Sequence, residues 1–210
     1  MHLLHLSDTH RQHRKLQNLP HADVIVHSGD ISGRGAEHDV MDFIDWFSRL
    51  DYPYKIFIAG NHDFYFERKT VEEIQAFLPE NCFYLCDSGI EIENVKFWGS
   101  PFTPWFLSWA FNRYRGDDIR RHWDLIPLNT DILITHGPPA DILDLTTDNI
   151  HTGCADLLQK ILEVKPKYHL FGHIHEAYGK ENYGNISFVN GSVLNEDYKL
   201  VNQPVLLEIR

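Results

Sequence analysis

Five short apolar runs recur along the chain, and each ends in a polar turn that contains glycine or histidine. They cover residues 3–6, 23–27, 55–59, 132–135 and 168–171. Runs of this length between such turns are typical of β-strands. Over residues 37–50 the apolar positions instead fall at steps of three and four, as at Val40, Phe43 and Phe47, which predicts a helix.

Two further helices are predicted from their start and stop signals. Residues 70–78 open with Thr70 and Glu73, which have the spacing of a capping box. Residues 154–162 form a third helical pattern, which stops near Pro166 because proline cannot continue a helix.

After residue 82 the predicted strands become closely spaced. They cover residues 83–85, 90–93, 96–99, 186–190 and 204–209. Turns at Glu93-Asn94 and at Tyr183-Gly184-Asn185 predict hairpins between some of them. Strand and helix units around a hairpin-rich middle predict an α/β fold with two packed mixed β-sheets flanked by helices. Because the chain has 210 residues and no linker or repeat, we expect one domain over residues 1–210.

Composition narrows the classes of protein that the chain can belong to. The formal net charge of -11 argues against stable binding to nucleic acid or to an anionic membrane. No apolar run approaches the ~18 residues of a membrane span, and the first residues do not follow a signal-peptide pattern. The three cysteines lack zinc-knuckle spacing and are expected to be reduced packing residues. These features predict a soluble, cytoplasmic protein.

Side chains that bind divalent cations follow each of the first five predicted strands. The motifs are Asp8-Thr9-His10, Gly29-Asp30, Gly60-Asn61-His62-Asp63, Thr135-His136-Gly137 and Gly172-His173-Ile174-His175. Singly, each has an ordinary structural explanation, such as a helix cap, a turn or a hydrogen-bonded histidine. Together they place carboxylate, amide and imidazole groups at the carboxyl ends of strands, where ligands collect in α/β folds. The pattern therefore predicts a metal centre, which would supply the positive charge that an anionic substrate needs.

The residue types and order of these motifs resemble the calcineurin-like metallophosphoesterase superfamily, over the chain from Asp8 to about Asn190. The resemblance implies a four-layer α/β/β/α sandwich with two divalent metal ions. It implies that one ion is held by Asp8, His10 and His175, that the other is held by Asn61, His136 and His173, and that Asp30 bridges both.

The resemblance also implies a reaction. Two divalent ions would share a water and lower its pKa, so that hydroxide attacks the phosphorus. His62 would face the substrate phosphate and act as the general acid, oriented by Asp63 in the tautomer that it needs. The mixed nitrogen and oxygen ligands suit Mn, Fe, Zn or Co, and the sequence does not choose among these metals.

A closer similarity lies in the second half of the chain. Residues 100–106, 136–139 and 166–179 are similar to the small metallophosphoesterase-domain-containing subgroup, the brain-type phosphodiesterases. This similarity implies hydrolysis of phosphodiesters. Some members of that subgroup lack a histidine of the last motif, whereas His173 and His175 are both present here, which implies a competent centre. A phosphomonoesterase and a non-catalytic scaffold are the alternatives.

Aromatic residues are concentrated in residues 100–115, between the third and fourth motifs. One interpretation is a buried connector that packs on the sheet. The other is that Trp105 or Phe106 forms a wall of the substrate pocket, because aromatic faces bind bases by stacking. The second interpretation favours a nucleotide-like or aryl phosphodiester. A small phosphate ester is therefore the expected partner.

Overall fold

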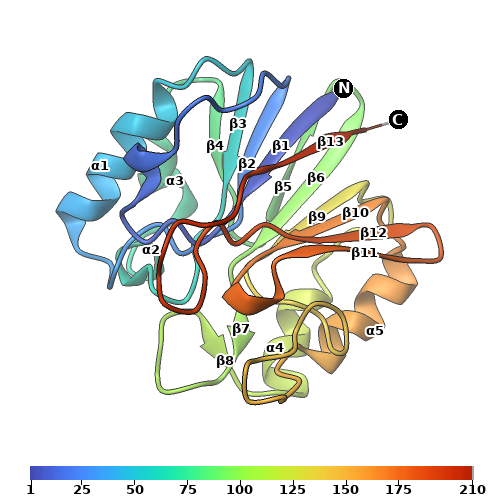
Figure 1. The fold of residues 1–210 in the computed structure, drawn as a ribbon. Helices are drawn as coiled ribbons and strands as arrows, with labels where there is room; N and C mark the ends of the chain where they lie inside the picture. The colour runs from blue at the N-terminus through green and yellow to red at the C-terminus, as the bar shows by residue number, and fades with distance from the viewer. Residues whose placement is uncertain (210) are drawn as a thin grey trace.

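The computed structural model describes residues 1–209, which form two large β-sheets with helices on their outer faces (Figure 1). The first sheet has the order β13-β1-β2-β3-β4, with β1 His2–Leu6, β2 Val24–His27, β3 Tyr54–Phe57, β4 Cys82–Tyr84 and β13 Val205–Glu208. The second has the order β11-β12-β10-β9-β6-β5, with β5 Ser88–Ile92, β6 Val95–Ser100, β9 Ile132–Thr135, β10 Tyr168–Phe171, β11 Gly179–Tyr183 and β12 Ile186–Asn190. The predicted α/β fold with two mixed sheets is confirmed.

Helices cover both sheets. Against the first sheet lie α1 Glu37–Ser48, α2 Phe64–Glu67 and α3 Val71–Gln75, and against the second lie α4 Asp117–Trp123 and α5 Ala155–Val164 (Figure 1). The predicted capping box is present, because Thr70 and Glu73 exchange side-chain to backbone hydrogen bonds at the start of α3. None of the helices within residues 1–209 is both long and apolar enough to cross a lipid bilayer.

The space between the sheets is one hydrophobic core. Leu3, Val24 and Ile56 point into it from neighbouring strands of the first sheet. There they share a buried cluster with Ile134 and Leu170 of the second sheet. Burial on both faces explains why the central strands are continuous apolar runs rather than alternating patterns.

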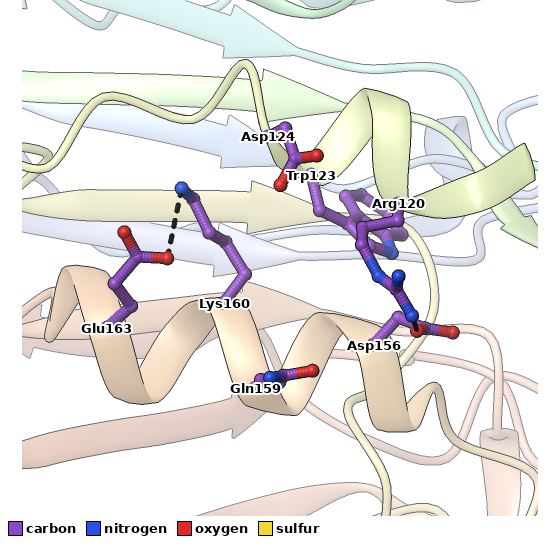
Figure 2. A pocket seen from close by; sticks show the side chains of 7 residues that line it. All are labelled: Arg120, Trp123, Asp124, Asp156, Gln159, Lys160 and Glu163. Carbon is purple, nitrogen blue, oxygen red and sulfur yellow. Dashed lines mark hydrogen bonds and ion pairs between the residues drawn. The ribbon is translucent and has the colours of Figure 1, made fainter. Parts of the chain in front are cut away.

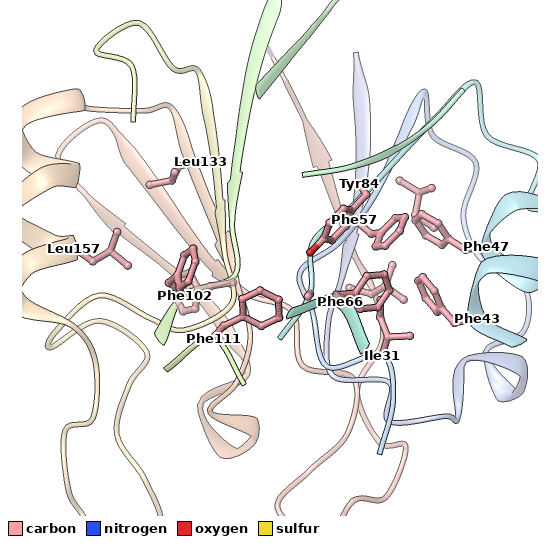
Figure 3. Packing of buried hydrophobic residues seen from close by; sticks show 14 of the residues in the cluster. Ile31, Phe43, Phe47, Phe57, Phe66, Tyr84, Phe102, Phe111, Leu133 and Leu157 are labelled. Atoms are coloured by element: carbon pink, nitrogen blue, oxygen red, sulfur yellow. The ribbon is translucent and has the colours of Figure 1, made fainter. Parts of the chain in front are cut away.

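The residues between those positions point outward to the helices. Figure 3 shows Phe43 and Phe47 of α1 against Phe57 of β3, and Leu157 of α5 on the side of Leu133 in β9. The ring centroids of Phe43 lie 5.0 Å from Phe47 and 5.7 Å from Phe57. Each helix is therefore anchored by large buried side chains at its own sheet.

Both predicted hairpins form. Strands β5 and β6 pair antiparallel, and so do β11 and β12. Glu93 and Asn94, in the first turn, have φ angles of 50° and 64°, the left-handed values that a two-residue hairpin turn requires. A small ribbon that the sequence did not predict, β7 Thr103–Pro104 with β8 Asn112–Arg113, lies inside the aromatic segment.

The fold brings the carboxyl ends of the parallel strands of both sheets to one edge of the molecule. Strands β1, β2 and β3 run parallel, as do β9 and β10. An isolated bridge joins Ser7, just after β1, to Ser192, just after β12. The loops that follow these strands therefore meet across the boundary between the sheets.

Candidate metal centre

The five sequence motifs converge at this shared edge. Asp8 follows β1, Asp30 follows β2, Asn61 follows β3, His136 follows β9 and His173 follows β10. Three overlapping groups have their ligand atoms within 4.8 Å of one another: Asp8 with His10 and His175, His10 with Asp30 and His62, and Asp30 with His136 and His173. The predicted ligands are therefore neighbours in space, although they come from loops far apart in the sequence.

The first half of the centre contains an unsatisfied carboxylate oxygen. The Nε2 atom of His175 lies 3.3 Å from Nε2 of His10 and 3.5 Å from Oδ1 of Asp8. That Oδ1 atom is buried and has no hydrogen-bond partner among residues 1–209, whereas Oδ2 accepts hydrogen bonds from Ser192 Oγ and the His173 amide. A buried oxygen without a partner is costly, and a cation beside it would remove that cost. The donor set therefore fits a divalent metal ion.

Asp30 lies between the two halves. Its Oδ2 atom is 3.5 Å from His10 Nε2 and 3.4 Å from His136 Nε2. Its Oδ1 atom accepts a hydrogen bond of 2.8 Å from the backbone amide of His62. In the second half, Asn61 Oδ1 lies 2.8 Å from His136 Nε2. One carboxylate oxygen thus faces ligands of both halves, as the bridging role requires.

Backbone carbonyl groups orient three of the histidines. The Nδ1 atoms of His10, His136 and His175 lie 3.2, 2.9 and 2.9 Å from the carbonyl oxygens of Ser32, Ser28 and Asn195. A carbonyl oxygen only accepts, so each Nδ1 carries a proton and each ring turns its Nε2 atom toward the centre. This arrangement is typical of histidines that bind metal ions.

Burial and nearby charge keep some histidines of the centre neutral and another protonated. Burial lowers the pKa of His10 to about 4 and of His173 to about 3, so both are neutral, as a ligand must be. Burial opposes the charged form of His136 as well, but the adjacent Asp30 raises its pKa to about 9. Burial would likewise raise the pKa of Asp30, and the histidines around it, His136 first, hold that pKa below its ordinary value. The proton on His136 supplies positive charge that a divalent cation can replace.

The backbone at the centre is tightly constrained. Asp8, Asp30 and His173 have φ angles of 55°, 56° and 72°, in the left-handed region that most residues avoid. A Cβ atom at Gly60 would collide with the Asp30 carboxylate, and one at Gly172 would collide with that of Asp8. These glycines are needed because the loops approach the ligands so closely.

His62 lies next to the ligands with one ring nitrogen facing them. Its Nδ1 donates to the carbonyl oxygen of Gly33 at 2.8 Å, and its Nε2 lies 3.9 Å from Asp30 Oδ2. The ring stacks on the indole of Trp109, with centroids 4.2 Å apart and planes at 20°. The imidazole is therefore fixed in orientation by a carbonyl group and an aromatic face.

The prediction that Asp63 orients His62 is wrong. Asp63 Oδ1 accepts from the amide and the hydroxyl of Ser32, and Oδ2 accepts from the amides of Ile31 and Gly60. Burial, and secondarily the charge of Asp30, raises the pKa of this carboxyl to about 6. Asp63 therefore joins the loops after β2 and β3, and it acts on His62 only through the position of that backbone.

The model of the calcineurin-like phosphoesterase family matches residues 1–177. The chain belongs to this family. Its members hydrolyse phosphate esters with divalent metal ions, so this phosphoesterase is a metal-binding hydrolase.

Individual relatives agree with this assignment. Metallophosphoesterase domain-containing protein 1 from Homo sapiens is 38% identical over 228 residues, which cover 97% of this chain and 69% of that protein. UPF0046 protein K07C11.7 from Caenorhabditis elegans is 33% identical over 216 residues, which cover 97% of this chain and 73% of the relative. The crystal structure of TT1561 from Thermus thermophilus superposes with a TM-score of 0.62 at 14% identity, over 90% of this chain and 88% of that one, and shows the shared fold.

The aromatic segment of the phosphoesterase is partly core and partly cavity wall. Phe102 and Phe111 are buried, with exposed fractions of 7% and 3%, as the buried-connector interpretation predicts. Trp105 and Phe106 are 48% and 62% exposed and line a cavity of about 430 Å³. His173 lines the same cavity, so these two aromatic side chains lie beside the metal centre.

Sequence reasoning missed two aromatic residues of the site. The sequence marks Trp109 only as part of an aromatic segment, yet it is the partner on which His62 stacks. Tyr198 lies edge-on to His10 and His175, at 4.9 and 5.1 Å between centroids. It belongs to the loop after β12, beyond the last motif, where no spacing or residue pattern marks it.

A second cavity, between α4 and α5, is unrelated to the centre. Figure 2 shows two pairs of oppositely charged side chains in it, with Arg120 directed at Asp156 and Lys160 at Glu163. The N···O distances are 2.9 and 3.2 Å. None of its lining residues belongs to the five motifs. Because its cations are already paired with carboxylates, this cavity does not offer a site for a phosphate.

Proposed function

We propose that this phosphoesterase hydrolyses a phosphodiester with a nucleotide-like or aryl arm, at a centre of two divalent ions. Two hollows support this proposal. The cavity beside His173 has an aromatic wall of Trp105 and Phe106, and a polar hollow of about 550 Å³ is lined by His10 and Arg11. A diester has two organic arms, and each half of the centre has a hollow beside it that can receive one.

The family pattern implies how the ligands would divide between the two ions. Asp8, His10 and His175 would hold one ion, Asn61, His136 and His173 would hold the other, and Asp30 would contact both. When bound, divalent ions would supply positive charge that offsets the phosphate and would lower the pKa of an attacking water. Carboxylate, amide and imidazole ligands suit Mn, Fe, Zn or Co.

His62 is proposed to protonate the leaving oxygen. Its Nδ1 proton is held by the Gly33 carbonyl, so Nε2 is the atom that can deliver a proton toward the centre. The stacked indole of Trp109 limits rotation of the ring, so this atom stays aimed at the region above Asp30. The chain's own part in the reaction is therefore to position the phosphate and to give one proton.

A panel of esters tests the proposal. Protein loaded with Mn²⁺, Zn²⁺ or Co²⁺ would be assayed on bis(p-nitrophenyl) phosphate, a nucleoside p-nitrophenyl diester and p-nitrophenyl phosphate. We expect kcat/KM to be highest for a diester, to be lost in Asp30→Asn, and to be unchanged in Arg120→Gln, which alters the cavity of Figure 2. Preference for the monoester would make the protein a phosphatase. No turnover by fully loaded protein would make it a scaffold.

A further inference from the structure

The cavity beside His173 has a polar lining that the reaction does not use. Besides the aromatic side chains of Trp105 and Phe106, it is lined by His151 and Arg115. Neither residue belongs to the five motifs. Both present nitrogen atoms, so we call them the donor pair.

The first member of the donor pair is held by a buried carboxylate. His151 Nδ1 lies 2.6 Å from Oδ1 of Asp144, whose residue is only 1% exposed. The other oxygen of Asp144 accepts from the amides of Asp141 and Gly153, at 2.9 Å each. A Cβ atom at Gly153 would collide with both Asp144 and a neighbouring carbonyl group, so the loop is built around this carboxylate.

This contact decides what the other nitrogen of His151 can do. The hydrogen bond to Asp144 raises the pKa of the imidazole, so the ring holds a second proton over a wider pH range. The Asp141 carboxylate also approaches the ring at Nδ1, at 3.7 Å. The side chain of His151 is 53% exposed, and when the ring is protonated its Nε2–H is left to donate.

The second member supplies the net charge. Arg115 donates from Nη1 to the carbonyl of Gly153 at 2.7 Å and from Nη2 to that of Thr152 at 2.8 Å. These bonds fix the guanidinium beside His151 and use two of its five N–H groups, so three remain. Because Asp144 and Asp141 both lie at the Nδ1 side of His151, the positive charge that remains free to face the cavity is that of the Arg115 guanidinium.

We propose that the donor pair, with the aromatic wall, binds a flat ring that carries its own anionic group, a carboxylate or a second phosphate. The proposal rests on the proposed function, because the ring would be one arm of the phosphodiester. A net charge of -11 repels anions from most of the surface, so a fixed pair of donors in one cavity would select such a substrate.

Two esters that differ in one group test the inference. Both are p-nitrophenyl phosphodiesters, one with a 4-carboxyphenyl arm and one with the neutral 4-carbamoylphenyl arm, so the leaving group is the same. We expect the wild-type KM to be about tenfold lower for the carboxylate, the size of a charge-assisted hydrogen bond. In His151→Asn the amide replaces Nδ1 and keeps the contact with Asp144, while the Nε2 donor is deleted. This variant and Arg115→Gln should lose the preference.

Matched controls are His21→Asn and Arg121→Gln, which change the same residue types at exposed positions elsewhere and should keep the preference. Equal KM values for the two esters in the wild type would overturn the inference. An equal rise in KM for both esters in His151→Asn would also overturn it, since such a rise reports damage to the loop. If neither ester is hydrolysed, the proposed function fails. Calorimetric affinities of 4-carboxyphenyl and 4-carbamoylphenyl phosphate then decide the inference, and equal affinities would refute it.

Discussion

Replacing the shared carboxylate tests whether the two halves of the centre depend on one residue. In Asp30→Asn the side chain keeps its shape, and its oxygen can still accept from the His62 amide. The charge that faces His10 and His136 is lost. We expect both ions to bind much more weakly. His175→Asn is the matched comparison, because its amide keeps the contact with Asn195 and removes only Nε2, a ligand atom of one half.

The size of the effect can be worked out from ligand linkage. At a free concentration one hundred times its Kd, each ion adds about 2.7 kcal/mol to the free energy of unfolding. A chain of this length shifts its Tm by about 2 to 4 °C per kcal/mol. One bound ion should therefore raise Tm by about 5 to 11 °C, and two bound ions should raise it by about 11 to 22 °C. We expect the full increment in wild type, about half in His175→Asn and almost none in Asp30→Asn.

The assay is thermal melting with Mn²⁺ or with a chelator, combined with elemental analysis of metal per chain. Only the metal-dependent increment in Tm is compared, because removing the buried charge of Asp30 also changes the stability of the metal-free protein. Two tightly held metals per chain in Asp30→Asn, or an increment equal to that of His175→Asn, would show that this carboxylate is not shared.

Three further predictions follow from the site and the core. His62→Ala should keep its metals but lower kcat by about 10²- to 10⁴-fold, with a smaller loss for good leaving groups; equal losses across leaving-group pKa values would exclude an acid role. Because Trp105 is 48% exposed, Trp105→Ala should leave Tm unchanged and raise KM for a nucleotide diester, whereas an unchanged KM would remove it from the substrate site. The rise should be roughly 5- to 150-fold, from about 1 to 3 kcal/mol of stacking. Burial lowers the pKa of His27 and of His169 to about 3, so as pH falls from about 6.5 toward 3 the unfolded chain takes up protons that the fold excludes. Each histidine should lower the free energy of unfolding by about 1.4 kcal/mol per pH unit in that window and should have no effect above it. Urea unfolding at several pH values measures this, and in His169→Gln the free energy of unfolding should depend less steeply on pH.

The candidate metal ligands could be predicted to lie together because the motifs that carry them follow strands. A carboxylate or histidine after an apolar run lies at the edge of a sheet wherever that strand is placed, so Asp8 or His136 could be assigned without knowing the strand order. The prediction that Asp63 orients His62 was wrong for a related reason. Adjacency in the chain does not give the direction of a side chain, and in the turn after β3 the two residues bond to different groups of the loop after β2, His62 to Gly33 and Asp63 to Ile31.

What the sequence could not supply are contacts between distant segments. Trp109 contacts His62 from a segment with several aromatic residues, and the sequence does not indicate which of them lies at the site. Tyr198 reaches His10 from a loop without any motif. The ribbon of β7 and β8 has only two residues in each strand, too few for a periodic pattern.

The bridge between Ser7 and Ser192 has a consequence for how the protein is made. Asp8 stands among the first residues, and its contacts are with His175 and Ser192, 167 and 184 positions later. Contacts of such long sequence separation form slowly, and a growing chain emerges from its amino end. During synthesis the strand that carries Asp8 is thus available long before its partners exist. The first half of the centre is completed only when the segment from His175 to Ser192 has folded back onto the strand that carries Asp8, so metal binding there reports that these distant segments have come together.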